Sequence, residues 1–537
     1  MRRRLWFPLA VLAIFSVLTL LMTWPQAQLL SSDATPHQDV YFNMWRLRWI
    51  AHALTTPAQL FDANIFFPER RTLTLSDAML VEGILAAPLT WAGLKPVLVH
   101  NLMLLGAIAG SGAAMFALVR YLTGSRGAGL IAGIVFAFAP YRFDHYMHME
   151  LQWAMWSPLA FLALHRAYDT GQWRYGLATG GCMALQMLSS IYYGLFLATL
   201  LGIGAVLLFP RDRRASVMVA GRVMVAGAVL AGVICFLYAQ PYLRTHERVG
   251  DRPVDQLAAF RATGGSYLSG TPGSWLYGDT ATRGAPERHL FPGITALLLA
   301  IVGLLLVVPS RRVIVYLLLM VAAFEMSFGL RGYLFSFLYD HVSAFRGLRA
   351  TARLGLFVLM FLGVLAGFGY AALAAGRPRL WRALLLGGCV TLLLAEYRTS
   401  LELTPFSNVA PPIYKMLSHQ PRGVLAEFPF PRVHELPGPD AEYSYLSTFH
   451  WFPLVNGYSG YYPSSYLERA ERVRSFPSQA AMIQLRRDMV QYIILHHSTY
   501  RPSVLNDIRT QLVRDALVVE VGTFDAADGP ATLYRMR

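Results

Sequence analysis

Cysteine and charged residues are both scarce in this sequence, and each shortage excludes a class of protein. The 537 residues include only three cysteines, and Cys182, Cys235 and Cys389 all fall inside apolar runs, so neither a disulfide framework nor a thiolate metal site is expected. Charged residues make up 14% of the chain and apolar residues 55%, with a mean hydropathy of +0.42. These values exclude an ordinary soluble domain and indicate a polytopic membrane protein.

Long apolar runs dominate the chain before residue 399. The first follows the basic start MRRR and is longer than the core of a secretory signal, so we expect an uncleaved first span. Eleven runs are suited to crossing a bilayer, and together they predict an all-α transmembrane bundle. They lie near 5–23, 97–119, 127–141, 151–165, 175–189, 191–209, 217–238, 290–309, 313–329, 354–374 and 383–396.

Acidic residues are fewer than basic ones, 31 against 46, and the formal net charge is +15. If Met1 is cytoplasmic and every run crosses, the cytoplasmic segments carry 16 Lys and Arg residues and only two acids, Asp169 and Asp212. This positive-inside pattern predicts a multi-pass protein of the bacterial cytoplasmic membrane with a cytoplasmic N-terminus. It also accounts for nearly all the excess charge, so no nucleic-acid partner is expected. The cytoplasmic segments are 1–4, 120–126, 165–175, 210–222, 309–312 and 375–382.

This topology requires that the apolar run 78–94 does not cross. The run contains Glu82, Gly83 and Pro88, which favours a re-entrant or interface-lying segment. If the run did cross, every later loop would change sides and the arginine clusters would lie outside.

The remaining polar segments are expected on the outer side. We predict a transmembrane domain over 1–398, with a first outer loop at 24–77 and a large outer loop at 239–289. The tail, 399–537, has short β-like runs such as VLAEFPF and YIILHH and reads as an extracytoplasmic α/β domain.

The first outer loop contains the strongest candidate for chemistry. Asp39 precedes an aromatic and cationic segment in which Phe42, Trp45 and Trp49 would share one face of a helix lying in the membrane interface. A helix N-terminus stabilises an ionised carboxylate, as a general base requires. An N-cap role for Asp39 is an equally weighted alternative. His37 lies two residues earlier and is a possible additional site residue.

Two further segments place basic side chains at outer ends of spans. In APYRFDHYMHMELQW, Arg142, His145 and His148 would share a face if helical. In FRGLRATARLG, Arg346, Arg349 and Arg353 recur at helical spacing on the side where positive charge is disfavoured, so an anion is expected there.

A phosphate suits these guanidinium groups, and anionic lipid headgroups are the alternative. We therefore predict donor-phosphate binding by Arg142, His145, Arg349 and Arg353, with His148 and Arg346 as additional candidates. A divalent metal held by His145, His148 and Asp39 is possible in principle, but the histidine spacing is weak support, so no metal or cofactor is predicted.

The tail segment STFHWFPLVNGYSGYYPSSY is rich in aromatic residues with polar tips. Asn456, Tyr458 and Tyr461 are predicted sugar or acceptor contacts, because aromatic faces stack on sugars while amides and hydroxyls bond to them. A turn-rich packing segment explains the same residues equally well.

Several strings resemble the GT-C superfamily of polytopic glycosyltransferases, in a group of uncharacterised bacterial members. They are HQDVYFNMWRLRW with LFDANIFFPERRTL, FAPYRFDHYMHMELQW, FRGLRATARLGLFVLMFLGVLAGFGY and PLVNGYSGYYP. The resemblance covers nearly the whole chain in architecture. It implies that an acid of the first outer loop is the catalytic base and that the donor is a polyprenyl-phosphate-linked sugar.

Carried over, the base is Asp39. Many superfamily members have two adjacent acids in this loop, whereas here His37 and Gln38 precede a single one, which leaves Asp33, Asp62 and Asp77 as substitutes. The expected activity is inverting sugar transfer to an envelope glycan or lipid; no complete acceptor motif for transfer to peptide is present. The alternatives are a non-catalytic lipid-linked glycan flippase or assembly partner, and another lipid-phosphate-using transferase such as a glycan polymerase or ligase.

Overall fold

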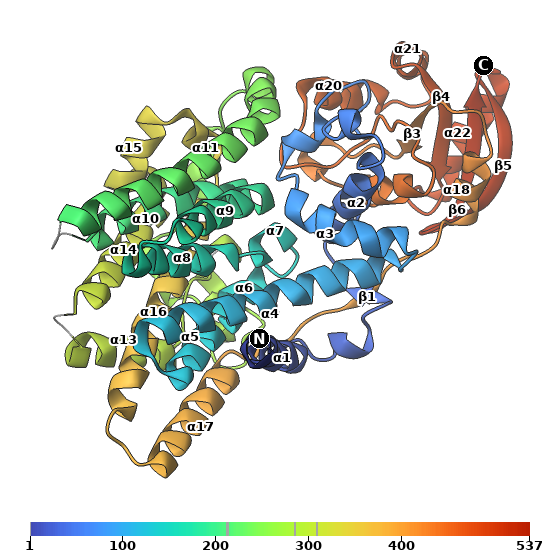
Figure 1. The fold of residues 1–537 in the computed structure, drawn as a ribbon. Helices are drawn as coiled ribbons and strands as arrows, with labels where there is room; N and C mark the ends of the chain where they lie inside the picture. Colours follow the sequence, from blue (N-terminus) through green and yellow to red (C-terminus); the bar gives the residue numbers. More distant parts are fainter. Residues whose placement is uncertain (1, 211–213, 284–285, 308–309) are drawn as a thin grey trace. The chain divides into compact units, whose positions relative to one another are not determined.

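The structure is a computed structural model that describes residues 2–210, 214–283, 286–307 and 310–537. It contains two compact units, and each is described by itself (Figure 1). The helical unit comprises Met1–Gln28, Leu102–Gln240 and Gly250–Glu402, and the mixed unit comprises Leu29–Asn101, Pro241–Val249 and Leu403–Arg537.

The helical unit is built from apolar helices around α16 (Gly355–Ala374), which is buried along most of its length. Glycines let its neighbours approach closely: a Cβ on Gly369 would lie 1.8 Å from the Leu299 carbonyl oxygen, and one on Gly303 would lie 2.4 Å from that of Leu365. Small residues at such crossings are typical of helices packed within a membrane. The other helices are α1 (Arg2–Met22), α4 (Pro96–Thr123), α5 (Arg126–Phe138), α6 (Pro140–Asp144), α7 (Met149–Gln152), α8 (Trp156–Thr170), α9 (Trp173–Ser189), α10 (Ile191–Leu208), α11 (Arg214–Val249), α12 (Val254–Ala259), α13 (Ile294–Val307), α14 (Arg311–Ser327), α15 (Tyr333–His341) and α17 (Arg379–Glu396).

Each of the eleven predicted spans coincides with a helix, namely α1, α4, α5, α8, α9, α10, α11, α13, α14, α16 and α17. Within the described ranges, four helices are long and apolar enough to cross a membrane: Pro96–Thr123, Ile191–Leu208, Val217–Val249 and Thr351–Ala374. The count of eleven crossings therefore stays a prediction. Helix α11 continues to Val249 and so occupies the start of the expected outer loop 239–289, whose place relative to the membrane stays a prediction.

The run 78–94 forms α3 (Leu80–Trp91), a helix of 12 residues. At 1.5 Å per residue it spans only about 18 Å, less than the roughly 30 Å of a hydrocarbon core. Helices α5 and α13 are only one and two residues longer, so length does not separate α3 from the predicted spans, and the non-crossing of the run 78–94 stays a prediction.

The mixed unit contains a four-stranded sheet in the order β3-β4-β6-β5 (Figure 1). Strands β3 and β4 are parallel and the other pairs are antiparallel. The predicted α/β tail is confirmed as a small sheet with helices. The strands are β3 (Val424–Phe428), β4 (Val490–His496), β5 (Val518–Ala526) and β6 (Gly529–Met536), and the helices are α18 (Pro412–Ser418), α19 (Asp440–Leu446), α20 (Ser464–Val473), α21 (Gln479–Arg487) and α22 (Pro502–Arg514).

The first outer loop, which the prediction grouped with the transmembrane domain over 1–398, instead forms one compact unit with the tail. Strand β1 (Asp33–Ala34) pairs with β2 (Thr404–Pro405). The backbone N–H groups of Phe66 and Phe67 donate to the carbonyls of Asn456 and Leu454, at 2.9 Å each. These strand-like bonds join segments nearly 400 residues apart in the sequence, and they place residues 29–101 in the same unit as the tail.

Helix α2 (Gln38–Ala53) follows β1 and is the core of this junction. Phe42, Trp45 and Trp49 share a face as predicted. The Phe42 and Trp45 rings stack with centroids 5.4 Å apart, and the Trp45 and Trp49 rings stack with centroids 6.4 Å apart. That face packs against Trp451 and Tyr458 of the tail and is buried. The aromatic face of α2 is thus covered by the protein itself, and the expectation that α2 lies in the membrane interface stays a prediction.

Candidate active site

Asp39 lies in the first turn of α2, in the mixed unit. The Tyr458 hydroxyl donates to Asp39 Oδ1 at 2.7 Å, and the carboxylate is 17% exposed. Burial, reinforced by the Asp39 carboxylate, raises the pKa of Tyr458 far above its ordinary value, so the phenol remains a donor. In general, a helix N-terminus and a hydroxyl donor both favour the ionised, proton-accepting form of a carboxylate.

His37 is the N-cap residue of α2. Its Nδ1 accepts from the Asp39 backbone N–H at 3.1 Å, so in that tautomer its proton is on Nε2. The same Nδ1 lies 3.3 Å from Asp39 Oδ2, a distance that becomes an ion pair only if the imidazole is protonated. The predicted additional role for His37 is therefore chiefly to shape the turn that presents Asp39.

The three acids given above as substitutes for Asp39 have different environments in the structure. Asp62 Oδ1 accepts from the Arg71 backbone N–H at 2.7 Å, where Arg71 has a left-handed conformation with φ 56°. Asp77 is buried, and its carbonyl accepts from Arg46 at 2.7 Å. Asp33 lies in β1. Of the four acids, Asp39 alone occupies the first turn of α2, which favours it over the others.

The predicted sugar contacts of the tail separate into three cases. Tyr458 is engaged with Asp39. Asn456 is fully buried; its side chain accepts from the Glu427 N–H at 2.8 Å and donates to the Glu427 carbonyl at 3.0 Å, so its geometry favours a structural role. Tyr461 is half-buried and its backbone N–H donates to Leu75 at 3.0 Å, so a sugar contact by its side chain stays a prediction.

In the helical unit, Arg142, His145 and His148 do not share one helix as the spacing predicted. Helix α6 ends at Asp144, and residues 145–148 form turns before α7, because Pro140 starts a separate short helix. His145 and His148 nevertheless meet, with 3.2 Å between their Nδ1 atoms. Arg142 is buried and donates to the Gln152 carbonyl at 3.0 Å.

The predicted helical spacing of Arg346, Arg349 and Arg353 is also wrong. Two short 3-10 helices, Ser343–Gly347 and Thr351–Leu354, are separated by an extended Leu348. Arg346 donates to the carbonyls of Tyr339 and Asp340 at 3.2 and 3.1 Å, which caps the end of α15.

Arg349 and Arg353 differ in their partners. Arg349 is half-buried with its guanidinium 5.1 Å from the Phe260 ring centroid, and within the described ranges it forms no ion pair. Arg353 is buried, and its Nε and Nη2 atoms donate to the Glu287 carboxylate at 3.1 and 2.8 Å. Arg349 is thus the more available cation for a phosphate.

Glu287 is the site residue that sequence reasoning missed. Burial alone would raise its pKa, but the Arg353 guanidinium lowers the pKa of Glu287 to about 2, so it is an anion at neutral pH. His145 Nε2 lies 3.4 Å from this carboxylate, yet burial lowers the pKa of His145 to about 3 and leaves the ring neutral. The anion expected beside Arg353 is therefore, in this structure, a side chain of the protein.

The prediction that Asp39 shares one pocket with the basic residues stays a prediction. Asp39 belongs to the mixed unit, whereas Arg142, His145, Arg349 and Arg353 belong to the helical unit. Within the helical unit, His145 and Arg353 both meet Glu287. Among the residues that the structure describes, no group of three or more His, Cys, Asp or Glu side chains is placed to hold a metal ion.

Comparison with known proteins relates the fold to solved structures. No protein-family model matches the sequence, and no curated protein matches it in sequence. The cryo-EM structure of the arabinofuranosyltransferase AftD from mycobacteria matches all of this chain with a TM-score of 0.66 at 13% identity, and a mutant of that protein matches 98% of it with a TM-score of 0.55 at 15% identity. The chain therefore shares its fold with AftD.

The likeness to AftD extends to the fold alone. This chain spans 40% of the length of AftD. A crystal structure of ArnT from Cupriavidus metallidurans bound to undecaprenyl phosphate also matches, over 98% of this chain and 97% of that one, with a TM-score of 0.42 and 12% identity.

Proposed function

We propose that this GT-C protein is a membrane glycosyltransferase that moves a sugar from a polyprenyl-phosphate-linked donor to an envelope glycan or lipid at the outer face of the cytoplasmic membrane. The GT-C fold supports a glycosyltransferase, and the position of Asp39 carries the proposal. A partly exposed carboxylate in the first turn of α2, bonded to Tyr458, has the charge and setting that a general base needs.

In the proposed reaction Asp39 accepts the proton of the acceptor hydroxyl. The acceptor oxygen forms a bond to the anomeric carbon, which passes through an oxocarbenium-like state, while the bond from that carbon to the phosphate oxygen breaks. The lipid phosphate leaves with the electron pair. Because the acceptor oxygen attacks the face opposite this leaving group, the configuration at the anomeric carbon is inverted. Tyr458 orients the carboxylate and, as an uncharged donor, does not compete for the proton.

Arg349 is the proposed ligand of the donor phosphate. Among the described residues this guanidinium has no carboxylate partner, so it is available to bind the leaving phosphate, where fixed positive charge stabilises the negative charge that develops. Arg353, four residues after Arg349, forms a buried cluster with Glu287 and His145, and Glu287 already neutralises its charge. Arg142, also buried, supports the same segment through Gln152.

The test compares Asp39→Asn with Asp62→Asn, a matched change at an exposed acid of the same loop. With purified donor and acceptor in proteoliposomes, Asp39→Asn is expected to lower turnover by about 10²–10⁴-fold while donor binding is retained, and Asp62→Asn to keep near-normal turnover. Near-normal turnover in Asp39→Asn would remove Asp39 from the role.

Arg349→Ala tests the phosphate ligand, and a product assay on the native protein separates the enzymatic proposal from a flippase. We expect the variant to weaken donor binding about tenfold or more, because a charge-assisted bond to phosphate is lost. If the native protein binds the donor but transfers it across the bilayer without any glycosyl product, the protein is a flippase and the enzymatic proposal is rejected.

A further inference from the structure

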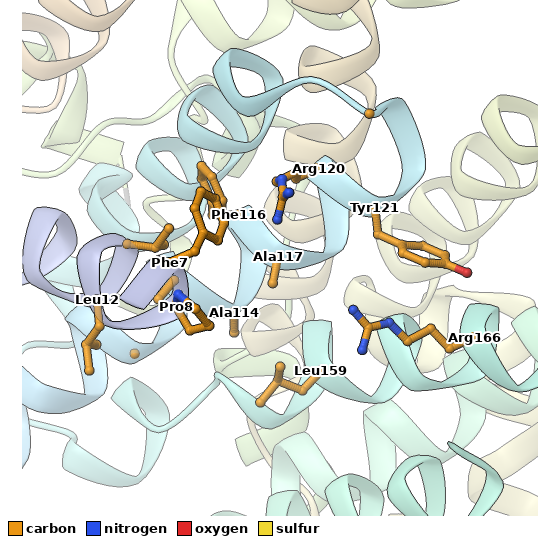
Figure 2. Close-up of a pocket in the computed structure, with 14 residues that line it drawn as sticks. Phe7, Pro8, Leu12, Ala114, Phe116, Ala117, Arg120, Tyr121, Leu159 and Arg166 are labelled. Atoms are coloured by element: carbon orange, nitrogen blue, oxygen red, sulfur yellow. The ribbon is translucent and has the colours of Figure 1, made fainter. Parts of the chain in front are cut away.

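A cavity in the helical unit lies away from all the residues assigned above. It has a volume of about 680 Å³ and is bounded by α1, α4 and α8. Its walls are mainly apolar, and two arginines, Arg120 and Arg166, lie at one end (Figure 2). The lining side chains include Phe7, Leu12, Ala114, Ala117 and Leu159.

The two arginines are held by aromatic rings and not by acids. The Arg120 guanidinium lies 4.2 Å from the Phe7 ring centroid, and the Arg166 guanidinium lies 5.4 Å from the Tyr121 ring centroid. The neighbouring acid, Asp169, accepts from the Tyr121 hydroxyl at 2.8 Å and pairs with Arg312 at 3.2 Å. Within residues 2–210, 214–283, 286–307 and 310–537, neither Arg120 nor Arg166 forms an ion pair. Figure 2 shows the two side chains reaching toward each other from opposite walls.

The dimensions of the cavity match one leaflet of a membrane. Along α4 its lining extends from Gly110 to Tyr121, which at 1.5 Å per residue is about 17 Å. Half of a hydrocarbon core is about 15 Å, so an acyl chain along the apolar walls would place its headgroup near the arginines. The predicted topology places residues 120–126 and 165–175 on the cytoplasmic side.

We infer that this cavity binds an anionic diacyl phospholipid of the inner leaflet, with its phosphate between Arg120 and Arg166 and an acyl chain against α1 and α4. Basic pockets between transmembrane helices on the cytoplasmic side recognise such headgroups. A polyprenyl chain is longer than one leaflet and suits this cavity poorly. The site is separate from the proposed donor site and does not depend on the proposed activity.

The test measures retained lipid on the full-length protein in phosphatidylcholine nanodiscs titrated with phosphatidylglycerol, using native mass spectrometry. Loss of two cationic contacts in Arg120→Gln/Arg166→Gln should weaken phosphatidylglycerol binding about thirtyfold, or about 2 kcal/mol at 1.4 kcal/mol per tenfold. Arg379→Gln/Arg382→Gln removes two arginines of another predicted cytoplasmic segment that do not line the cavity, and should leave binding unchanged.

A second variant keeps the inference testable if the arginine variant folds poorly. Ala117→Phe fills the apolar part of the cavity and should reduce phosphatidylglycerol retention without any change of charge. Equal retention of phosphatidylcholine, preferential retention of added polyprenyl phosphate, or unchanged binding in both variants would overturn the inference.

Discussion

The Arg353–Glu287 pair allows a quantitative test of which cation meets the donor phosphate. The Arg353 guanidinium binds the carboxylate with two atoms, Nε at 3.1 Å and Nη2 at 2.8 Å. Both side chains are 10% exposed or less. Removing one partner of a buried pair leaves an uncompensated charge and typically destabilises a protein by about 3–5 kcal/mol. Glu287→Gln and Arg353→Met should each lower the free energy of unfolding by about this amount.

The double variant Arg353→Met/Glu287→Met should recover most of that loss, because a buried ion pair replaced by apolar groups is about neutral. A double-mutant cycle on thermal unfolding in detergent therefore predicts a coupling of several kcal/mol. Arg312 and Asp169 form a matched control in the same unit: their side chains are 38% and 41% exposed, so their coupling should stay below about 1 kcal/mol.

Donor affinity distinguishes the two roles of Arg353. If Arg349 carries the phosphate contact, the double variant at 353 and 287 should bind the polyprenyl-phosphate donor within about tenfold of the native protein, whereas Arg349→Ala should lose affinity. The reasoning is refuted if the coupling at 353 and 287 is no larger than that of the exposed control. It is also refuted if Glu287→Gln tightens donor binding, since Arg353 would then be the residue that binds the phosphate and Glu287 would compete with the phosphate for it.

Three further changes test the mixed unit. Tyr458→Phe removes the donor to Asp39 and should lower kcat about tenfold to a hundredfold with little change in KM, as steady-state kinetics would show; an unchanged kcat would exclude an orienting role. Asn456→Ala leaves the buried Glu427 backbone groups unpaired and should destabilise the unit by about 2–3 kcal/mol in thermal unfolding, whereas an effect confined to sugar affinity would restore the predicted contact. Burial would lower the pKa of His496, but hydrogen bonds to Asp528 and Glu427 raise it to about 9. Its stabilisation, about 3 kcal/mol, is complete below about pH 6.5 and lost as pH rises through 9; His496→Gln should abolish this pH dependence of the melting temperature.

The sequence predicted the helices well because a bilayer imposes long apolar runs that are visible locally. Each predicted span coincides with a helix, and the aromatic face of α2 was also correctly placed by its spacing. The partner of that face was not predictable, because the pairing of residues 66 and 67 with residues 454–456 depends on contacts that are remote in sequence. Apolar residues that recur every three to four positions indicate which side chains share a helix face, but not what covers that face.

The errors at the basic segments have a local cause. Helical spacing was assumed for Arg346, Arg349 and Arg353, but an extended Leu348 separates two 3-10 turns, so the three side chains have different environments. Glu287 carried no signal of its own, as a single acid in a long loop resembles any solvated residue. Its only indication was indirect: arginines on the outer side of a membrane require an anion, and the sequence does not say whether that anion is a ligand or a side chain.

The position of Asp39 makes the tail part of the proposed chemistry. Tyr458, the donor to its carboxylate, is 419 residues away in sequence, and Trp451 covers Trp49 on the same helix. A base works efficiently only when its surroundings hold it in place before the substrate arrives. The tail therefore supplies the support that a short loop cannot provide for itself, and the first outer loop and the tail act as one structural element around α2.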